Sequence, residues 1–474
     1  MSASPSGDVL VKKDAVRFLF GCLAFALGCS GPSIEATPPP PPTAVASVRP
    51  RVETPTELKH LDARVQLVEA GGKLSVDGDV VWHIRLGTSR KLTLDAIGFE
   101  VASVTQGGTG ADLAYEATAN QLTIGPVAGQ PGDEAKVQIR YHVTPAMGLM
   151  RDGQSAWTAF HTWQWLPVAS DPSRRSTVQL GVSPPADWEG AGVIATGDGP
   201  MRPGPDLASA VPHPSYLWGF YVGVTQLVER EEEGLPVEVW TRRPKHRGAE
   251  LAGDRTAAAW QRWRDSGGPW PGGDTPQPYL EVFVPGDTKQ ELVGMTFLPE
   301  RYLDTLKDDA KEDWLLVHEL VHQVWGNRVT CATWGDFWLN EAVAVWWVGR
   351  DKLLRGEKDG YERERALWRK RVDAAIVRGD DLRIERPGVA VKDAGGTVVY
   401  HGGALVVHEL AEADPEGFTR QLHRWGEEAL DEGHRALTTQ AFLDRIGLAP
   451  DARTRIETML ASVATVTDKP KPRD

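Results

Sequence analysis

The sequence predicts an α+β protein with two folded domains, an antiparallel β-sandwich followed by a mainly helical domain. Residues 55–232 consist of short runs of alternating apolar and polar residues, broken by Gly, Pro, Asp and Asn. From about residue 250 the runs become longer and amphipathic, as helices require. The chain has 474 residues, 41% of them hydrophobic and 25% charged, which is enough for two or three ordinary globular domains.

The first 54 residues differ from the rest. A basic flank precedes the apolar run 18–29, which is too short to span a membrane, and five consecutive prolines follow at 38–42. We expect a leader at 1–29 and an extended linker at 30–54. The leader resembles that of bacterial lipoproteins, with Cys29 as the lipid-bearing residue; an ordinary cleaved secretory signal is the alternative. Either reading predicts an exported protein, and the first predicts an outer-membrane lipoprotein facing the periplasm.

The predicted β-sandwich covers 55–232. Its clearest strands are DARVQLVEA (62–70), LSVDGDVVWHIRL (74–86) and KVQIRYHV (136–143). Their alternation buries one face of each strand and exposes the other, as in a sandwich of antiparallel sheets. With only Cys331 outside the leader, no disulfide framework can support the fold.

The predicted helical domain covers 233–462, and a polar tail, predicted to be disordered, follows at 463–474. A buried strand is expected at 279–286. Helices are expected at 251–267, 308–326, 402–413 and 418–430, with another starting near residue 340. The formal charge of −13, with no long basic run, argues against binding to nucleic acid.

The segment HELVHQVWGNRVTCATWGDFWLNEA (318–342) carries the pattern of a metal site. His318 and His322 are four residues apart on the expected helix, so their imidazoles share one face. Glu341 can complete three ligands for a single Zn²⁺ and leave a fourth position open. Glu319 lies on the adjoining face, where a carboxylate can accept a proton from water. The alternative, which this pattern disfavours, is a buried histidine pair without metal.

Several segments together resemble the gluzincin aminopeptidases, the group of aminopeptidase N and leukotriene hydrolase. HELVHQVWGNRVT and WGDFWLNEAVA are similar to that family's zinc segment, and VVYHGGALVVHEL (398–410) to its Y-x-x-G-A motif. The resemblance covers most of residues 55–450 and implies a thermolysin-like fold for the second domain. It implies zinc binding by His318, His322 and Glu341, and acid–base catalysis by Glu319. It also implies that Tyr400 stabilises the oxyanion.

Other residues near the metal segment have expected roles of their own. Asp336 is expected to accept a hydrogen bond from a zinc-bound imidazole; an exposed loop aspartate is the alternative. The family's substrate-binding motif G-x-M-E-N falls on Val293–Phe297, which places Gly294, Met295 and Thr296 at the substrate.

The sequence departs from the family at that motif. Its glutamate, which binds the free amino group of the substrate, would be replaced by Thr296. No carboxylate occurs in 156–168, where a second amine-binding side chain is expected. We also expect the protein to lack the family's helical carboxy-terminal domain.

The sequence therefore predicts a zinc metallopeptidase with one Zn²⁺ per chain and peptides or proteins as substrates. Aminopeptidase activity and cleavage without need of a free amino terminus are equally favoured. The alternative is a non-catalytic envelope lipoprotein that binds a peptide or a partner on the same fold. Its membrane contact would be the lipid anchor.

Overall fold

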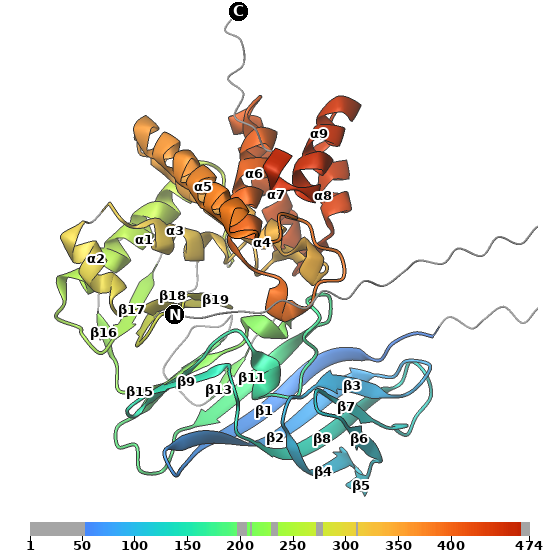
Figure 1. Ribbon diagram of the computed structural model, residues 1–474. Helices are drawn as coiled ribbons and strands as arrows, with labels where there is room; N and C mark the ends of the chain where they lie inside the picture. The colour runs from blue at the N-terminus through green and yellow to red at the C-terminus, as the bar shows by residue number, and fades with distance from the viewer. Residues whose placement is uncertain are drawn as a thin grey trace, which may run out of the picture. The chain divides into compact units, whose positions relative to one another are not determined.

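The computed structural model describes residues 53–196, 206–208, 211–228, 236–271, 278–309 and 311–465 (Figure 1). The leader with Cys29, most of the linker and the tail beyond residue 465 lie outside these ranges. Residues 53–474 form one structural unit, so the β-rich and helical parts are described together. Within the described residues, no helix has both the length and the apolar character needed to cross a membrane.

The amino-terminal part contains three sheets. An eight-stranded sheet has the order β13-β11-β1-β2-β8-β4-β5, with β14 also pairing with β11. Its strands are β1 (Glu57–Ala70), β2 (Lys73–Arg85), β4 (Glu100–Gln106), β5 (Ala111–Asp112), β8 (Glu134–Val143), β11 (Arg175–Ser183), β13 (Asp206–Ala208) and β14 (His213–Pro214). A four-stranded sheet joins β12 (Gly192–Ala195), β15 (Phe220–Gly223), β10 (Ser155–Thr158) and β9 (Leu149–Asp152). A three-stranded sheet joins β3 (Leu92–Asp95), β7 (Gln121–Ile124) and β6 (Tyr115–Ala117).

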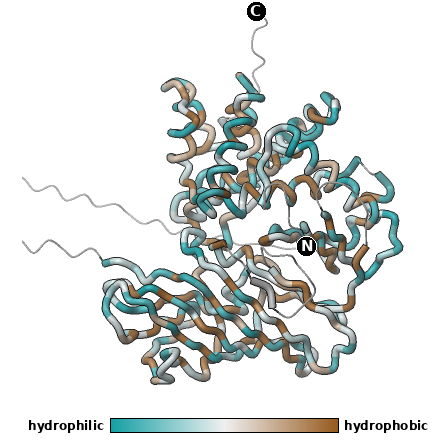
Figure 2. Tube along the Cα trace, turned by 180° about the vertical axis from the view of Figure 1, so that it is seen from behind, coloured by the Kyte–Doolittle hydropathy of each residue, from teal (hydrophilic) through white to brown (hydrophobic). Residues whose placement is uncertain are grey.

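The alternation of apolar and polar residues in the sequence determines which side chains of these strands are buried. Along β1 and β2 buried and exposed side chains alternate, and brown and teal alternate along the same region in Figure 2. Trp82 of β2 contacts Trp218, with ring centroids 6.5 Å apart, and Trp165 packs edge-on against Phe220 of β15. Aromatic side chains thus join two of the sheets in one core. The expectation of antiparallel pairing holds for most strands, but β1 and β11 pair in parallel from His60–Thr177 to Gln66–Ser183.

The second part begins with a five-stranded sheet of order β16-β17-β18-β20-β19. Its strands are β16 (Gln226–Val228), β17 (Val237–Thr241), β18 (Tyr279–Val284), β20 (Met295–Pro299) and β19 (Gln290–Leu292). The three central strands are parallel, and the edge strand β19 is antiparallel to β20. Because β16 pairs with β17, this sheet begins before the boundary predicted at residue 232.

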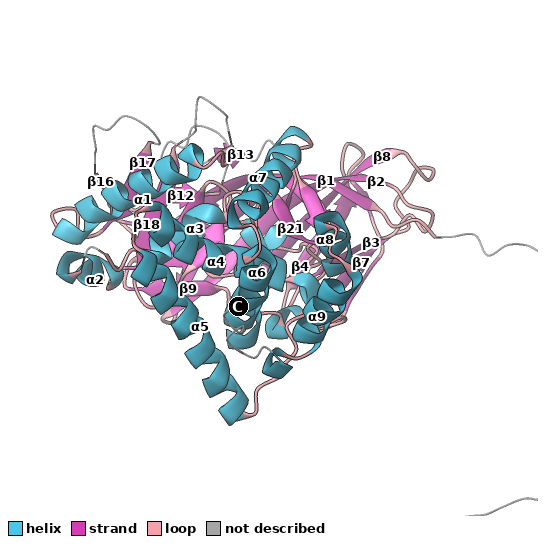
Figure 3. Ribbon diagram, turned by 90° about the horizontal axis from the view of Figure 1, so that it is seen from above, coloured by secondary structure: helices cyan, strands magenta, loops and turns pink. Residues whose placement is uncertain are grey.

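Helices cover the rest of this part, and Figure 3 shows them lying over the sheets. They are α1 (Arg247–Asp265), α2 (Tyr302–Asp308), α3 (Trp314–Val321), α4 (Trp338–Leu354), α5 (Lys358–Arg378), α6 (Gly403–Ala411), α7 (Pro415–Asp431), α8 (Thr439–Ile446) and α9 (Pro450–Ala461). Between them, β21 (Val329–Cys331) pairs with β22 (Arg435–Leu437), and the π-helical turn η5 (Val398–Gly402) leads into α6.

The expected helices are confirmed with one correction. A single helix was expected over 308–326, but α2 ends at Asp308 and α3 runs only from Trp314 to Val321. The Asp313 carboxylate, which is fully buried, receives two hydrogen bonds from Arg355 at the end of α4 instead of extending a helix. Helix α4 is buried from Trp338 to Asp351, so it forms the centre of the helical part.

Candidate active site

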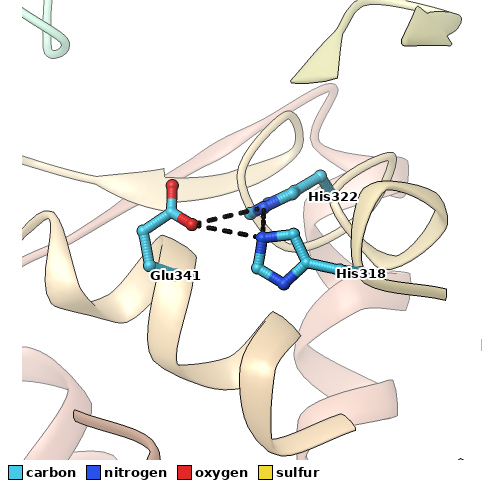
Figure 4. Close-up of side chains that lie close together, drawn as sticks. All are labelled: His318, His322 and Glu341. Carbon is cyan, nitrogen blue, oxygen red and sulfur yellow. Dashed lines mark hydrogen bonds and ion pairs between the residues drawn. The ribbon is translucent and has the colours of Figure 1, made fainter. Parts of the chain in front are cut away.

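The three predicted metal ligands converge in the structure. His318 lies in α3, His322 directly follows that helix, and Glu341 lies in the first turn of α4. The two Nε2 atoms are 3.1 Å apart, and the Oε2 atom of Glu341 is 3.4 Å from Nε2 of His318 and 3.5 Å from Nε2 of His322 (Figure 4). All three side chains are buried.

This donor set fits one Zn²⁺. Two imidazole nitrogens and a carboxylate oxygen, all within 4.8 Å of one another, are the ligand types and number of a catalytic zinc site. The Nδ1 atom of His322 lies 2.8 Å from the Trp325 carbonyl, which accepts its proton and leaves the Nε2 lone pair for an ion. His318 has no partner at Nδ1.

The charges of the cluster also favour a bound cation. Although burial opposes both shifts, the opposite charges of the pair raise the pKa of His322 to about 10 and lower the pKa of Glu341 to about 2. Without an ion, an imidazolium supplies the positive charge that Glu341 requires. A divalent cation held by the same atoms would take over that role.

Glu319 stands beside the triad as expected. It is 4% exposed, and its Oε2 atom has no hydrogen-bond partner. Burial raises the pKa of Glu319 to about 8, while the charge of His322 opposes the rise. A carboxyl group with a pKa near neutrality can both take up and release a proton, as general acid–base catalysis requires.

Tyr400 also reaches the site, from the π-helical turn η5. Its ring stacks on His318 with centroids 6.4 Å apart and an interplanar angle of 20°. Burial, together with the nearby carboxylates of Glu341, Glu291 and Glu319, raises the pKa of Tyr400 well above its ordinary value. The phenol therefore keeps its proton and can donate a hydrogen bond. Short π-helical turns are frequent at functional sites.

Asp336 does not support a zinc ligand, contrary to the expectation. Its Oδ1 atom accepts hydrogen bonds from the Thr439 amide and hydroxyl, and its Oδ2 atom accepts one from the Thr333 hydroxyl. These hydrogen bonds connect the turn before α4 to the start of α8. The Trp325 carbonyl, which accepts from Nδ1 of His322, orients that imidazole instead.

The segment assigned to substrate binding lies beside Glu291 and Glu319 in the sheet. Met295 and Thr296 belong to β20, an interior strand, and both are fully buried. Gly294 forms the turn before it, with φ +72°, and donates its amide to Gln323. None of the three lies on the edge strand, where unpaired backbone groups are available to a peptide.

Glu291, on the edge strand β19, was not predicted as a site residue from the sequence. Glu291 pairs directly opposite Thr296, so both side chains lie on the same face of the sheet. Its carboxylate, with that of Glu319 and the imidazole of His322, forms a second group of atoms within 4.8 Å of one another. It is 5% exposed, and its Oε1 atom has no hydrogen-bond partner. The threonine at position 296 therefore does not leave this site without a further carboxylate.

A signal for Glu291 was present in the sequence. The five residues Thr288–Leu292 match G-x-M-E-N at one letter, the glutamate, while Val293–Phe297 also match at one letter, the methionine. The glutamate is the residue of the motif that binds the amino group, so the motif is better aligned with Thr288–Leu292 than with Val293–Phe297.

Phe160 lies next to this edge strand and was not singled out either. Its amide donates to the Oε1 atom of Gln290, 2.7 Å away, and its φ of +58° is unusual for a bulky residue. Its ring contacts Tyr216, Trp334 and Phe337.

The comparisons with known proteins agree with this geometry. Residues 293–425 match the peptidase family M1 domain. The chain is 25% identical over 192 residues to mouse (Mus musculus) glutamyl aminopeptidase, covering 38% of this chain and 20% of that protein. It is 32% identical over 126 residues to aminopeptidase B of Rattus norvegicus, covering 24% of this chain and 19% of that protein. It thus spans about a fifth of the length of these curated relatives.

Solved structures show the same fold. The M1 zinc metallopeptidase from Deinococcus radiodurans superposes with a TM-score of 0.64 at 21% identity, over 88% of this chain and 96% of that one. Yeast LTA4 hydrolase in complex with bestatin superposes with a TM-score of 0.71 at 18% identity, over 92% of this chain and 72% of that one. Residues 293–425 therefore form a peptidase family M1 domain, and His318, His322 and Glu341 within it fit the single Zn²⁺ of a zinc metallopeptidase.

Proposed function

We propose that this protein is a zinc aminopeptidase, which removes residues from the free amino terminus of peptides. The observation that carries the proposal is Glu291, a buried carboxylate with an unpartnered oxygen beside the zinc triad. Burying a carboxylate without a partner is unfavourable, and the α-ammonium group of a peptide would provide the missing charge and hydrogen bonds.

The pKa of Glu291 supports this role. Burial and the charge of Glu341 raise it to about 7, although His322 opposes the rise. An arriving ammonium group favours the ionised carboxylate, so binding would complete a buried ion pair. A blocked amino terminus offers no charge and leaves the desolvation of Glu291 uncompensated. The protein should therefore discriminate strongly between free and acetylated peptides.

The reaction then follows from the residues around the triad. Bound by His318, His322 and Glu341, Zn²⁺ would supply Lewis acidity, polarising the scissile carbonyl and making water more acidic. Glu319 takes the proton of the attacking water and delivers it to the departing amine. Tyr400 donates its hydroxyl to the oxygen that gains negative charge during attack. Glu291 fixes the amino terminus, so that the first peptide bond meets these groups.

The test uses one peptide with a free and with an acetylated amino terminus, and zinc-loaded protein. Mass spectrometry locates every cut, and the Glu319→Gln variant is the blank. Sequential trimming of the free peptide alone is the expected result. Cleavage of both at internal bonds would show an endopeptidase instead, and no cleavage with zinc bound would favour the non-catalytic binding role.

Export and lipidation at Cys29 are also proposals, supported by the basic flank, apolar run and proline-rich linker of the sequence. A lipid anchor predicts that full-length protein partitions into the membrane fraction and that Cys29→Ser does not. Equal partitioning of the two would contradict it.

A further inference from the structure

A buried arginine lies where the amino-terminal part contacts the helical part. Arg175 begins β11 and is 8% exposed. Its Nη2 atom donates to the hydroxyl of Thr330 on β21, 2.7 Å away, and its Nε atom donates to the Pro172 carbonyl. Its Nη1 atom has no hydrogen-bond partner, and no carboxylate of the described residues forms an ion pair with it. Burying a charge without a counter-ion is unfavourable.

The ionisable groups that could compensate this charge are neutral. Burial lowers the pKa of Arg175 to about 10, so the guanidinium stays positive at neutral pH. The groups whose negative charge would stabilise it are the Tyr216 phenol and the Cys331 thiol. Burial raises the pKa of both well above their ordinary values, so both keep their protons. Arg175 therefore needs a negative charge from another source.

A second unused donor lies close to Arg175. His434 directly precedes β22, which pairs with β21 beside Thr330. Its Nδ1 atom is buried and has no hydrogen-bond partner. Burial lowers the pKa of His434 to about 4, and the neighbouring charge of Arg175 acts in the same direction. The imidazole is therefore neutral at pH 7 and can carry a proton at Nδ1 for an acceptor.

Other basic side chains surround this donor. His213 lies on β14, which pairs with the start of β11. Arg328 directly precedes β21 and donates from Nη1 to the backbone carbonyl before His434. Both groups lower the pKa of His434. Glu432 opposes them, but it is exposed and forms an ion pair with Arg435. An anion beside His434 would therefore meet a positive potential.

We propose that Arg175 and His434 bind a small monovalent anion, such as chloride, between β11 and the β21–β22 pair. The ion would accept hydrogen bonds from Nη1 of Arg175 and Nδ1 of His434, and the first of these is charge-assisted. One uncompensated positive charge suits a monovalent anion better than a dianion. The site uses none of the residues of the mechanism above, so the inference does not depend on the proposed aminopeptidase function.

The site is connected to the third zinc ligand through β21. Thr330 accepts from Arg175. The amide of the next residue, Cys331, donates to Oδ1 of Asn340, 2.8 Å away. Asn340 precedes Glu341 in α4. A bound anion would thus stabilise the contact between β11 and the strand that holds the start of α4, and its first expected effect is on the stability of the folded protein.

The experiment compares chloride with gluconate, an anion too large for a buried site, at constant ionic strength so that screening is equal. An anion that binds only the folded protein raises its unfolding temperature. The Tm of the zinc-loaded protein should rise with chloride concentration, and the dependence gives an apparent Kd. Arg175→Gln keeps a donor for Thr330 but removes the charge, so it should raise that Kd about 10-fold or more. His434→Gln should raise it as well.

Arg435 supplies the matched control. It follows His434 in the chain but donates to Glu428 and Glu432, so Arg435→Gln should keep the wild-type dependence on chloride. Crystals of the wild-type protein grown in bromide should show an anomalous peak between Arg175 and His434.

Three results would overturn the inference. The first is a Tm that does not respond to chloride more than to gluconate. The second is an unchanged Kd in Arg175→Gln, which would show that chloride acts elsewhere. The third is the absence of bromide from the position between Arg175 and His434. Should Arg175→Gln fail to fold, an unchanged Kd in His434→Gln would refute the site in its place.

Discussion

The role of Glu291 is tested by replacing it with glutamine, which keeps the shape of the side chain and removes its charge. Glu291 is 5% exposed and lies within 4.8 Å of atoms of Glu319 and His322, so water cannot screen its interaction with a bound ammonium group. Removing one partner of a buried, hydrogen-bonded charge pair costs about 2 to 5 kcal/mol. Since about 1.4 kcal/mol corresponds to a factor of ten, kcat/KM for a free-amine peptide should fall between about 30-fold and several thousand-fold.

The assay compares kcat/KM for the free and the acetylated form of the same fluorogenic peptide. Glu291→Gln also changes the field at Glu319, because Glu291 contributes to the raised pKa of that residue. That change affects both substrates, so the ratio of the two values isolates amine recognition. The ratio should collapse in Glu291→Gln and persist in Glu238→Gln. Glu238 is a half-buried carboxylate of the same sheet that accepts from Trp240 and belongs to neither group of candidate ligands.

Two results would refute this reasoning. An equal loss on both peptides would mean that Glu291 supports the chemistry or the fold and not the amine. A full preference for the free peptide in Glu291→Gln would mean that another group holds the amino terminus.

Two further residues give predictions of a different kind. Tyr400→Phe should lower kcat by about 100- to 1,000-fold with KM little changed, because one oxyanion donor is lost; steady-state kinetics at constant zinc content measures this, and an effect confined to KM would exclude the role. In the metal-free protein, Glu319→Gln should stabilise the fold more at pH 8 than at pH 5.5. The folded pKa of about 8 lies above the ordinary 4.5, so the stability that protonation of Glu319 contributes is complete below 4.5 and is lost as the pH rises through 8, on the order of 5 kcal/mol at most. Glutamine does not titrate, so the stability of Glu319→Gln relative to the wild type should increase from pH 5.5 to pH 8. Thermal unfolding of both proteins in chelator measures this, and an equal stability difference at the two pH values would contradict the raised pKa of Glu319.

The predicted site residues that the structure brings together depend on local geometry. His318 and His322 share a face because four residues make about one helical turn, and this needs no knowledge of the tertiary fold. Glu319 follows from the same helix. The alternating pattern of β1 and β2 likewise contains the information for their burial.

The parts that were missed depend on contacts between distant segments. Asp336 binds Thr439, 103 residues later, and no local pattern indicates which of several partners a loop aspartate will meet. The parallel pairing of β1 with β11 joins residues more than a hundred positions apart. Glu291 was missed because β19 is three residues long, too short for periodicity to reveal which strand forms the edge of the sheet.

The register of β19 against β20 gives a last prediction that separates the two alignments of the substrate motif. If the motif lay at Val293–Phe297, Thr296→Glu would restore a missing carboxylate and strengthen the preference for free amines. In the structure, Thr296 is fully buried, faces Glu291 across the strand pair and donates its hydroxyl to the Gln290 carbonyl. A glutamate there would lose that bond and place a third carboxylate against Glu291 and Glu319, so it should destabilise the protein and reduce activity on both peptides. Thr296→Val, which removes the hydroxyl without adding charge, controls for the lost hydrogen bond and should be milder. A stable Thr296→Glu protein with an enhanced preference for the free peptide would show that Thr296, and not Glu291, occupies the amine-binding position.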